Sequence, residues 1–306
     1  MIAQGSTLTL SPVDDLWFGF SNTEGKKYMQ TVVVTGGTDG LGKGIALHYL
    51  KAGARVLAIG STQAKGEALI EEAREISAAG RIHFLSVDLT SVAGSRRLVE
   101  EIEDTYTSVD KLVLCAQRYR LFGKRSVTPE GFEYSFALAY LSRFVLSYGL
   151  LDALQRTKQP VIMNVGTPGV GLGSVHWDDL QFERGYNGNR ATLQSFRAND
   201  LLGVGFAAAH GTGPVTYIGY NPGVVSTGMP NSLPLPLRLM TRAAFALAAT
   251  PVERAIKPMV ELLDNPPSEP FVARWKKKPV DLGKKAFDAE DALRLKYITE
   301  QLVGVR

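Results

Sequence analysis

Short apolar runs alternate with longer segments of helical pattern along most of the chain. The runs occupy residues 31–35, 55–59, 82–87, 111–115, 161–165 and 215–220. Because these mainly apolar runs are bounded by turn residues and do not alternate in polarity, they predict strands buried on both faces of a sheet. Helical patterns fill the intervening segments, for example residues 41–51, 64–79, 94–106 and 129–156. This alternation predicts an α/β fold with a doubly wound parallel sheet and helices on both faces, in three αβα layers.

The ends of this pattern set the expected domain limits. Among the 306 residues there is no internal repeat or low-complexity tract, so residues 30–306 are predicted to form a single domain. Residues 1–29 mix polar and aromatic residues and are interpreted as an N-terminal arm. Residues 226–250 join a proline-rich stretch to an apolar one, which fits either a flap that covers a substrate or an ordinary packed helix.

Composition narrows the classes of function. The net charge is only +4 and the basic residues are dispersed, apart from clusters at residues 118–125 and 274–278, so nucleic-acid binding is not expected. The single cysteine excludes an intramolecular disulfide, and the 4 histidines show no metal-ligand spacing. No run reaches the length of a transmembrane helix and no export leader is present, so a cytoplasmic protein without a membrane span is expected.

Glycines gather where the first predicted strand gives way to a helix. The sequence of residues 35–42 is Thr-Gly-Gly-Thr-Asp-Gly-Leu-Gly. Glycine permits the positive φ angles and the close backbone approach that are needed where helix amides face a pyrophosphate. The turn therefore predicts a dinucleotide site. Its candidate cofactor-binding residues are Gly36, Thr38, Asp39, Gly40, Leu41 and Gly42.

With this turn, which reads Thr-Gly-x-x-x-Gly-x-Gly, the chain resembles the short-chain dehydrogenase/reductase superfamily. The resemblance covers residues 30–304, and residues 178–183 and 288–304 are similar to the retinol-dehydrogenase-like branch. It implies a Rossmann fold, a bound NAD or NADP, a small-molecule substrate and a homodimer or tetramer. The family's adenine, ribose and nicotinamide segments have counterparts that add these cofactor-binding candidates: Asp88, Leu89, Cys115, Ala116, Gln117, Pro222, Gly223, Val225 and Thr227.

Two positions bear on how the cofactor would bind. At the end of the second strand, where the family discriminates the 2′-phosphate of NADP, no acid is present, and Ser61 and Thr62 offer hydroxyls. Asp39 would oppose a phosphate if it lay nearby. The segment favours NADP(H) over NAD(H). Gln117 replaces a family glycine that leaves room for the ribose, so its side chain is expected either to swing away or to narrow the cleft.

The residues that carry the family's usual chemistry differ here. By resemblance, the family's asparagine, serine, tyrosine and lysine correspond, in that order, to Ala139, Thr167, Thr192 and Phe196. The register around the last two is supported by matches at Gln194, Ser195, Ala198 and Asn199. The family's lysine makes a phenol with a pKa of about 10 usable near neutrality, and both members of that pair are missing. Ordinary alcohol oxidation or carbonyl reduction is therefore not expected.

Three kinds of function stay open on this reading. The first is hydride transfer with another proton source, for example reduction of an activated double bond in a small apolar, carrier-linked or coenzyme A-linked substrate. Its candidate catalytic residues are Thr167, Thr192 and Tyr119, and Arg118 is a further candidate to stabilise an enolate. The second is a non-redox isomerase, lyase or cyclase. The third is a catalytically inactive sensor of dinucleotides.

A basic cluster follows the fourth predicted strand. It consists of Arg118, Arg120, Lys124 and Arg125. Such a cluster would attract a carboxylate, a coenzyme A thioester or an acidic carrier protein. An ordinary solvated loop has the same composition, so both interpretations stay open.

Overall fold

Eight strands form one sheet in the computed structural model, which describes residues 28–225 and 249–304. Their order is β3-β2-β1-β4-β5-β6-β7-β8, and only β8 runs antiparallel to its neighbour. The strands are β1 (Thr31–Thr35), β2 (Arg55–Gly60), β3 (Ile82–Ser86), β4 (Lys111–Leu114), β5 (Val161–Val165), β6 (Thr216–Asn221), β7 (Phe271–Trp275) and β8 (Lys278–Pro279). The doubly wound fold predicted from the apolar runs is confirmed, with two more strands at the edge.

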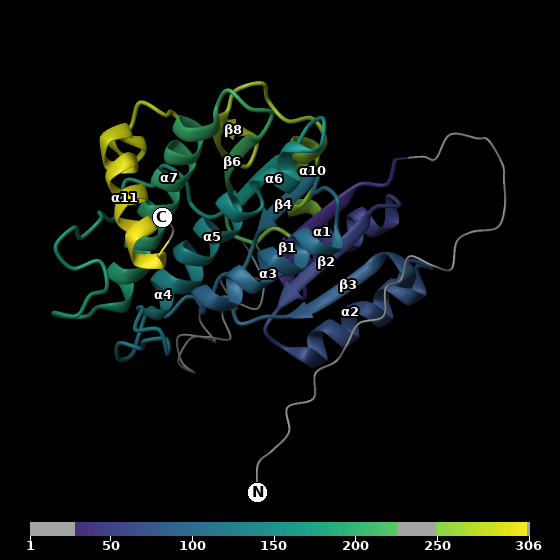
Figure 1. The fold of residues 1–306 in the computed structure, drawn as a ribbon, viewed down its shortest axis with the longest axis horizontal. Coiled ribbons are helices and arrows are strands. Elements are labelled where there is room, and N and C mark those ends of the chain that lie inside the picture. Colours follow the sequence, from purple (N-terminus) through teal and green to yellow (C-terminus); the bar gives the residue numbers. More distant parts are fainter. Residues whose placement is uncertain (1–27, 226–248, 305–306) are drawn as a thin grey trace, which may run out of the picture.

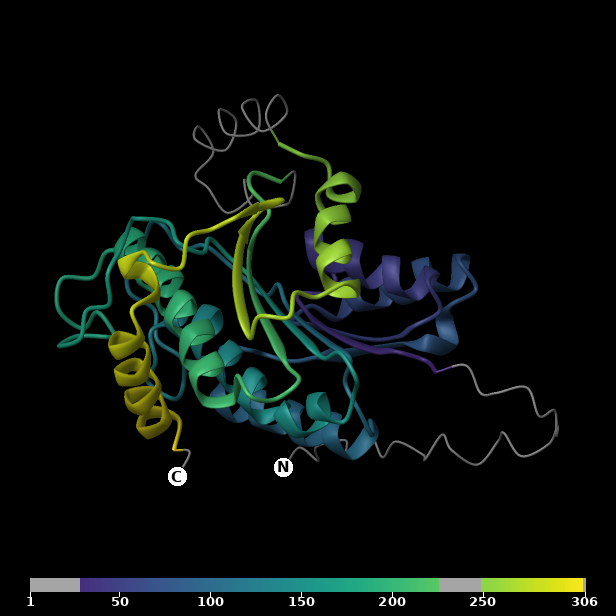
Figure 2. The same cartoon turned by 90° about the horizontal axis from the view of Figure 1, so that it is seen from above.

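Helices cover both faces of this sheet (Figures 1 and 2). They are α1 (Gly40–Lys51), α2 (Gln63–Glu75), α3 (Val92–Thr105), α4 (Tyr134–Phe136), α5 (Ser142–Gly149), α6 (Leu151–Gln155), α7 (Gly188–His210), α9 (Val252–Ala255), α10 (Lys257–Asp264) and α11 (Ala289–Val303). Short 3₁₀ turns η2 (Ala79–Arg81) and η5 (Lys285–Phe287) and a π-helical turn η3 (Ala137–Leu141) complete the set.

Each face of the sheet has its own hydrophobic core. On one face, α1, α2 and α10 pack Ile45, Leu69 and Met259 against the strands. On the other face, α3, α5 and α7 do the same, and α11 packs outside α7. Figure 2 shows the two helical layers with the sheet between them. Burial of each such side chain contributes about 1.5–3 kcal/mol, so the sheet is held from both sides.

The long helix predicted over residues 129–156 is wrong in its extent. Residues 129–133 form a loop closed by a bridge between Val127 and Glu133, and the helix begins only at Tyr134. Glu133 caps it by accepting a hydrogen bond from the Phe136 amide at 2.7 Å. The helix then passes through the π-helical turn before α5. Pro129 and Gly131 favour the loop, because neither residue suits a helix interior.

The strand order reverses between β1 and β4, which pair with each other. The helix after β1 packs on one face of the sheet, and the helices after β4 pack on the other. In sheets of this kind, ligands bind in the crevice outside the carboxyl ends of the strands at such a switch point. The predicted arm (residues 1–29) lies almost wholly outside the described residues, and so does most of the predicted flap (residues 226–250).

Candidate active site

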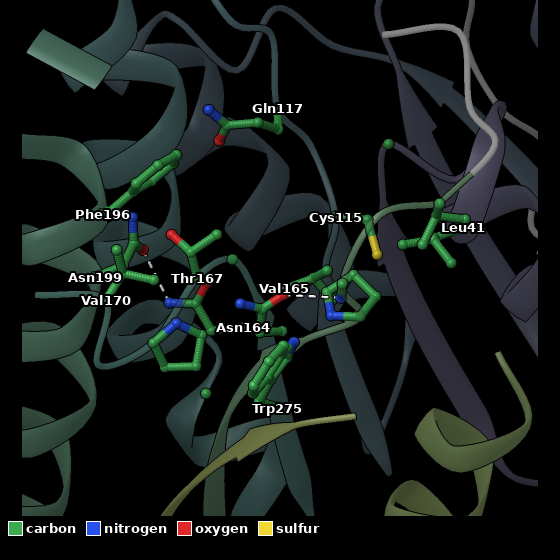
Figure 3. Close-up of a pocket in the computed structure, with 18 of the residues that line it drawn as sticks. Leu41, Cys115, Gln117, Asn164, Val165, Thr167, Val170, Phe196, Asn199 and Trp275 are labelled. Carbon is green, nitrogen blue, oxygen red and sulfur yellow. Dashed lines mark hydrogen bonds between the residues drawn. The ribbon is translucent and has the colours of Figure 1, made fainter. Parts of the chain in front are cut away.

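A cavity of 1120 Å³ lies at the carboxyl ends of the central strands. One side, here called the nucleotide half, is formed by Gly36, residues 39–42 and Lys65. The other side, the reaction half, is formed by Gln117, Tyr119, Arg143, residues 164–170 and Phe196. Figure 3 shows Leu41 and Cys115 across the cavity from Thr167 and Phe196, with Trp275 at its edge. The crevice predicted by the topology is therefore a real pocket.

Backbone conformation shapes the nucleotide half. Gly36 and Gly40 have φ angles of 64° and 51°, in the left-handed region that glycine tolerates. A Cβ atom on Gly42 would lie 2.3 Å from the Gly36 carbonyl oxygen, so the turn has no room for a side chain there. Asp39 caps α1 by accepting from the Gly40 amide at 2.8 Å. The first turn of α1, with glycines at positions 40 and 42, thus lines the cavity, and the backbone amides of a helix start suit a pyrophosphate.

The structure brings most of the predicted cofactor-binding residues to one cavity. Those that line it are Gly36, Asp39, Gly40, Leu41, Gly42, Cys115, Gln117, Pro222, Gly223 and Val225. Those that lie apart from it are Thr38, Ser61, Thr62, Asp88, Leu89 and Ala116. Thr227 falls outside the described residues. The glycine turn and the segment after β6, far apart in sequence, therefore face the same space.

Two of the candidates that do not line the cavity, Asp88 and Leu89, have local structural roles. Leu89 is only 5% exposed and belongs to the hydrophobic core. The Asp88 carboxylate accepts hydrogen bonds from the amide and hydroxyl of Thr90, at 2.9 and 2.8 Å. Ser61 and Thr62 are exposed where α2 begins, so their hydroxyls stay accessible.

Lys65 is a residue of the nucleotide half that sequence reasoning missed. It stands in the first turn of α2, and its Nζ atom lies 2.5 Å from Asp39 Oδ2. Burial raises the pKa of Asp39, but the hydrogen bond and charge of Lys65, together with the Gly40 amide and the charge of Lys43, lower it by more, so that this pKa is below its usual range. Lys65 thus neutralises the acid that was expected to oppose a phosphate. A basic residue in the first turn after strand two was the available signal.

The π-helical turn and α7 meet beside the reaction half. Ala139 lies in that turn and is buried, and its carbonyl oxygen accepts a hydrogen bond from Asn199 at 2.7 Å. Phe196, one turn earlier in α7, lines the cavity (Figure 3). The side of α7 that faces the cavity thus presents an aromatic ring, an amide and, at Asp200, a carboxyl group.

Two threonine hydroxyls are buried without a hydrogen-bond partner in residues 28–225 and 249–304. Thr167 follows β5 and lines the cavity, where its Oγ1 atom is unpartnered. Thr192 lies in α7, is 3% exposed and also leaves its Oγ1 unpartnered, but it does not line the cavity. An unsatisfied buried hydroxyl costs about 1–3 kcal/mol, so Thr167 is well placed to bind a polar atom of a ligand.

Arg143, which sequence reasoning also missed, lies in α5 with a side chain that is 2% exposed yet lines the cavity. Its guanidinium donates to the carbonyl oxygens of Val165 at 2.9 Å and Ala116 at 3.1 Å, and also to Asn164 Oδ1. It lies 3.4 Å from Gln117 Oε1, so the Gln117 side chain turns toward the arginine. The guanidinium therefore bridges the ends of β4 and β5.

Tyr119 contributes a phenol to the same space. Its ring meets Phe196 edge to face, with the ring centroids 6.0 Å apart. Burial raises the pKa of Tyr119, and the positive charge of Arg143 opposes that rise. Two of the neighbouring basic residues have structural contacts instead: Arg120 stacks on the Tyr134 ring at 4.3 Å, and Arg125 donates to the Gln181 carbonyl at 2.9 Å.

The chain is similar in sequence and in fold to known proteins. Residues 30–178 match the short chain dehydrogenase family. Polyprenol dehydrogenase of Danio rerio is 30% identical over 78% of this chain and 71% of its own length. The chain belongs to the short-chain dehydrogenase family. Human retinol dehydrogenase 14 is 27% identical over 92% of this chain and 88% of its own. A short chain dehydrogenase structure from Salmonella enterica superposes with a TM-score of 0.62 at 18% identity, covering 82% of this chain and 96% of that one.

Membership of the short-chain dehydrogenase family makes the chain an oxidoreductase-like protein that binds NAD or NADP. The predicted resemblance is thereby confirmed at the level of the family and of its retinol-dehydrogenase-like relatives. The matched segment contains the glycine turn, β4 and Arg143.

One more titratable group of this short-chain dehydrogenase borders the reaction half. Asp200 is 4% exposed, and burial raises its pKa to about 7 even though Arg197 lies 3.1 Å away and the Gly169 amide donates to it. Within the described ranges, no group of His, Cys, Asp and Glu residues is arranged to hold a metal ion. No helix among the described residues has the length and hydropathy needed to cross a membrane.

Proposed function

We propose that this protein is an NADP(H)-dependent oxidoreductase that reduces an activated double bond in an apolar substrate, with a reaction centre different from the family's usual one. The observation that carries the proposal is the continuous cavity from the glycine turn to a reaction half that contains Thr167, Tyr119 and Arg143. The nucleotide half fits a dinucleotide, and the reaction half offers groups that polarise a carbonyl and donate a proton.

The sequence register supports the different reaction centre. It assigns Ala139, Thr167, Thr192 and Phe196 to the positions of the family's asparagine, serine, tyrosine and lysine. At two of these positions the side chains found here cannot donate or carry charge, since Ala139 is apolar and Phe196 is an aromatic ring. Thr192 lies apart from the cavity, and a hydroxyl that is not acidic is a poor proton donor. Ketone reduction by the usual phenol and ammonium pair is therefore not the activity proposed.

Reduction of a conjugated double bond has simpler requirements. When bound, NADPH supplies a hydride to the carbon β to a carbonyl, and the electron pair moves to the carbonyl oxygen as an enolate. The unpartnered Thr167 hydroxyl donates a hydrogen bond to that oxygen, which lowers the energy of the enolate. The Tyr119 phenol then transfers its proton to the α carbon, and water reprotonates the phenolate. Hydride and proton together saturate the bond.

The walls of the cavity point to an apolar substrate with an anionic end. Apolar side chains lining it include Val170, Phe196, Phe271, Trp275 and Val280. The names of two similar proteins refer to retinol and polyprenol, which are apolar isoprenoid alcohols.

The charged residues that line the cavity are mostly basic. The basic ones are Lys65, Arg118, Arg143, Lys276 and Lys284, and the acidic ones are Asp39 and Asp200. This excess of positive charge supports a carboxylate, a coenzyme A thioester or a carrier-linked acyl group as the anionic end.

The nucleotide half favours NADP(H) over NAD(H). Lys65, which follows the exposed Ser61 and Thr62 in the chain, brings a positive charge to the nucleotide half and already neutralises Asp39. The described part of the β2 end holds no acid to bind the ribose diol, because Gly60, Ser61 and Thr62 occupy it. A 2′-phosphate is the group that this set of side chains suits.

The proposal is tested by incubating the purified protein with NADPH and a panel of conjugated enones and enals, some with isoprenoid chains and some linked to coenzyme A. We expect loss of NADPH absorbance matched, one to one, by the saturated carbonyl product in mass spectrometry. Conversion that continues without reduced cofactor would instead identify an isomerase, lyase or cyclase. Tight cofactor binding with no conversion across the panel would identify a dinucleotide sensor.

A further inference from the structure

Lys111, Arg143 and Arg197 are deeply buried cations among the described residues, and two of them are paired with a carboxylate. Lys111, 3% exposed at the start of β4, lies 3.3 Å from Asp264. Arg197 lies 3.1 Å from Asp200. Arg143 has no ion pair within residues 28–225 and 249–304. Arg143 is thus the exception.

The surroundings of Arg143 hold its charge in place without cancelling it. Its acceptors are backbone carbonyls and side-chain amides, all of them neutral, and its Nε atom has no partner among the described residues. Burial lowers the pKa of Arg143, but a guanidinium stays protonated in proteins. A buried charge without a counter-ion is costly, so its presence in a cavity indicates that a bound molecule benefits from it.

The location of Arg143 shows which part of a bound molecule would benefit. The guanidinium bridges the Ala116 and Val165 carbonyls, at the ends of the two strands that border the reaction half. Its charge acts on the Tyr119 phenol and the Cys115 thiol, both of which line the cavity. On the other wall, Phe196 brings an uncharged ring. Arg143 is therefore the positive charge buried within this half.

We propose that Arg143 supplies the fixed positive charge of the reaction centre, where it favours a reduced, neutral nicotinamide over an oxidised, cationic one and stabilises negative charge that forms on the substrate oxygen. The inference rests on the proposed function for the identity of the cofactor. It assigns Arg143 as a positioning residue whose field acts on the bound molecules, held in place by its four neutral acceptors.

The experiment compares the affinities of the protein for NADPH and NADP⁺, which differ in charge only at the nicotinamide ring. Dissociation constants are measured by calorimetry for the wild type and for Arg143→Met and Arg143→Lys. We expect the wild type to prefer NADPH, Arg143→Met to lower that preference by about tenfold, and Arg143→Lys to retain most of it, because a charge within a partly buried site acts over several ångströms. No substrate is needed for this measurement.

Two further variants show whether a changed preference for NADPH reflects the lost charge or a misfolded protein. Asn164→Asp places a carboxylate beside the intact guanidinium, so it should lower the preference as Arg143→Met does while keeping the arginine. Lys111→Met removes the paired buried cation at the opposite end of β4 and should leave the preference unchanged. The melting temperature of each variant reports on folding.

The outcomes separate this inference from the proposed function. An unchanged preference in folded Arg143→Met or Asn164→Asp, with NADPH still bound, overturns the inference alone. Binding of neither nucleotide by the wild type overturns both. A preference that falls with the charge, in a protein that reduces no member of the enone panel, supports the inference and rejects the proposed substrate chemistry.

Discussion

The nucleotide half of the cavity depends on backbone groups, whereas the reaction half depends on side chains. The nucleotide half depends on backbone: two glycines with positive φ and a third that has no room for a Cβ atom. The reaction half depends on side chains, namely Tyr119, Arg143 and Thr167, which come from the segment after β4, from α5 and from the segment after β5. A backbone site requires glycine at fixed spacing, whereas a side-chain site can be rebuilt from new positions while the fold stays the same.

This difference explains how the nucleotide half can keep the family's glycine pattern while the side chains of the reaction half differ from the family's. The glycine turn must keep its sequence if helix amides are to reach a pyrophosphate. A cation or a proton donor only has to reach the right place, and Arg143 reaches the reaction half from α5 while Phe196 occupies α7. Substitutions in each half test this difference separately.

The largest effect is expected in the nucleotide half, from Gly42→Ala. Because a Cβ atom there would lie 2.3 Å from the Gly36 carbonyl oxygen, the turn must open and the helix amides must move. We expect NADPH affinity to fall by at least about 100-fold, equivalent to ~2.7 kcal/mol, in a calorimetric titration. Gly80→Ala is the matched control, because a Cβ atom at Gly80 meets nothing within 4 Å. Equal binding by wild type and Gly42→Ala would show that the turn does not hold the cofactor.

The same contrast decides what could be predicted from the sequence. Six strands and the glycine turn were predicted because runs of apolar residues and glycine spacing are local signals. The strand β7 was missed, since its apolar residues Phe271–Ala273 are followed by Arg274 and Trp275, and the run is short. Arg143 and Lys65 were missed because an arginine or lysine in a helical pattern is typical of a solvent-facing position. Only packing shows that Arg143 is buried.

The next largest effect is expected in the reaction half, from Tyr119→Phe. If Tyr119 donates the proton, kcat for double-bond reduction should fall by about 100-fold, within the range for general acids, while KM changes little. Tyr186→Phe is the control, because its hydroxyl donates to Glu133 at 3.2 Å and the residue does not line the cavity. A larger loss in Tyr186→Phe than in Tyr119→Phe would reassign the donor.

The pH profile sharpens that test. Burial raises the pKa of Tyr119 above its ordinary value of 10, so the folded protein keeps the proton on the donor as pH increases. The active, protonated form is lost only when pH rises through the raised pKa. Wild-type kcat should therefore show no fall attributable to Tyr119 between pH 6 and pH 9.

The smallest effect is expected from a substitution of Lys65, which tests whether the nucleotide half depends on backbone groups alone. Lys65→Ala removes the cation that bonds Asp39 and leaves that carboxylate facing the cavity unneutralised. We expect NADPH affinity to fall by about tenfold and NADH affinity to change little, since one charge-assisted hydrogen bond contributes ~1.5–3 kcal/mol and NADH lacks the 2′-phosphate. Lys277→Ala is the control, because Lys277 pairs with Glu261 and does not line the cavity. Equal losses for NADPH and NADH would show that Lys65 supports the glycine turn rather than the phosphate, and the nucleotide half would then be a backbone site throughout.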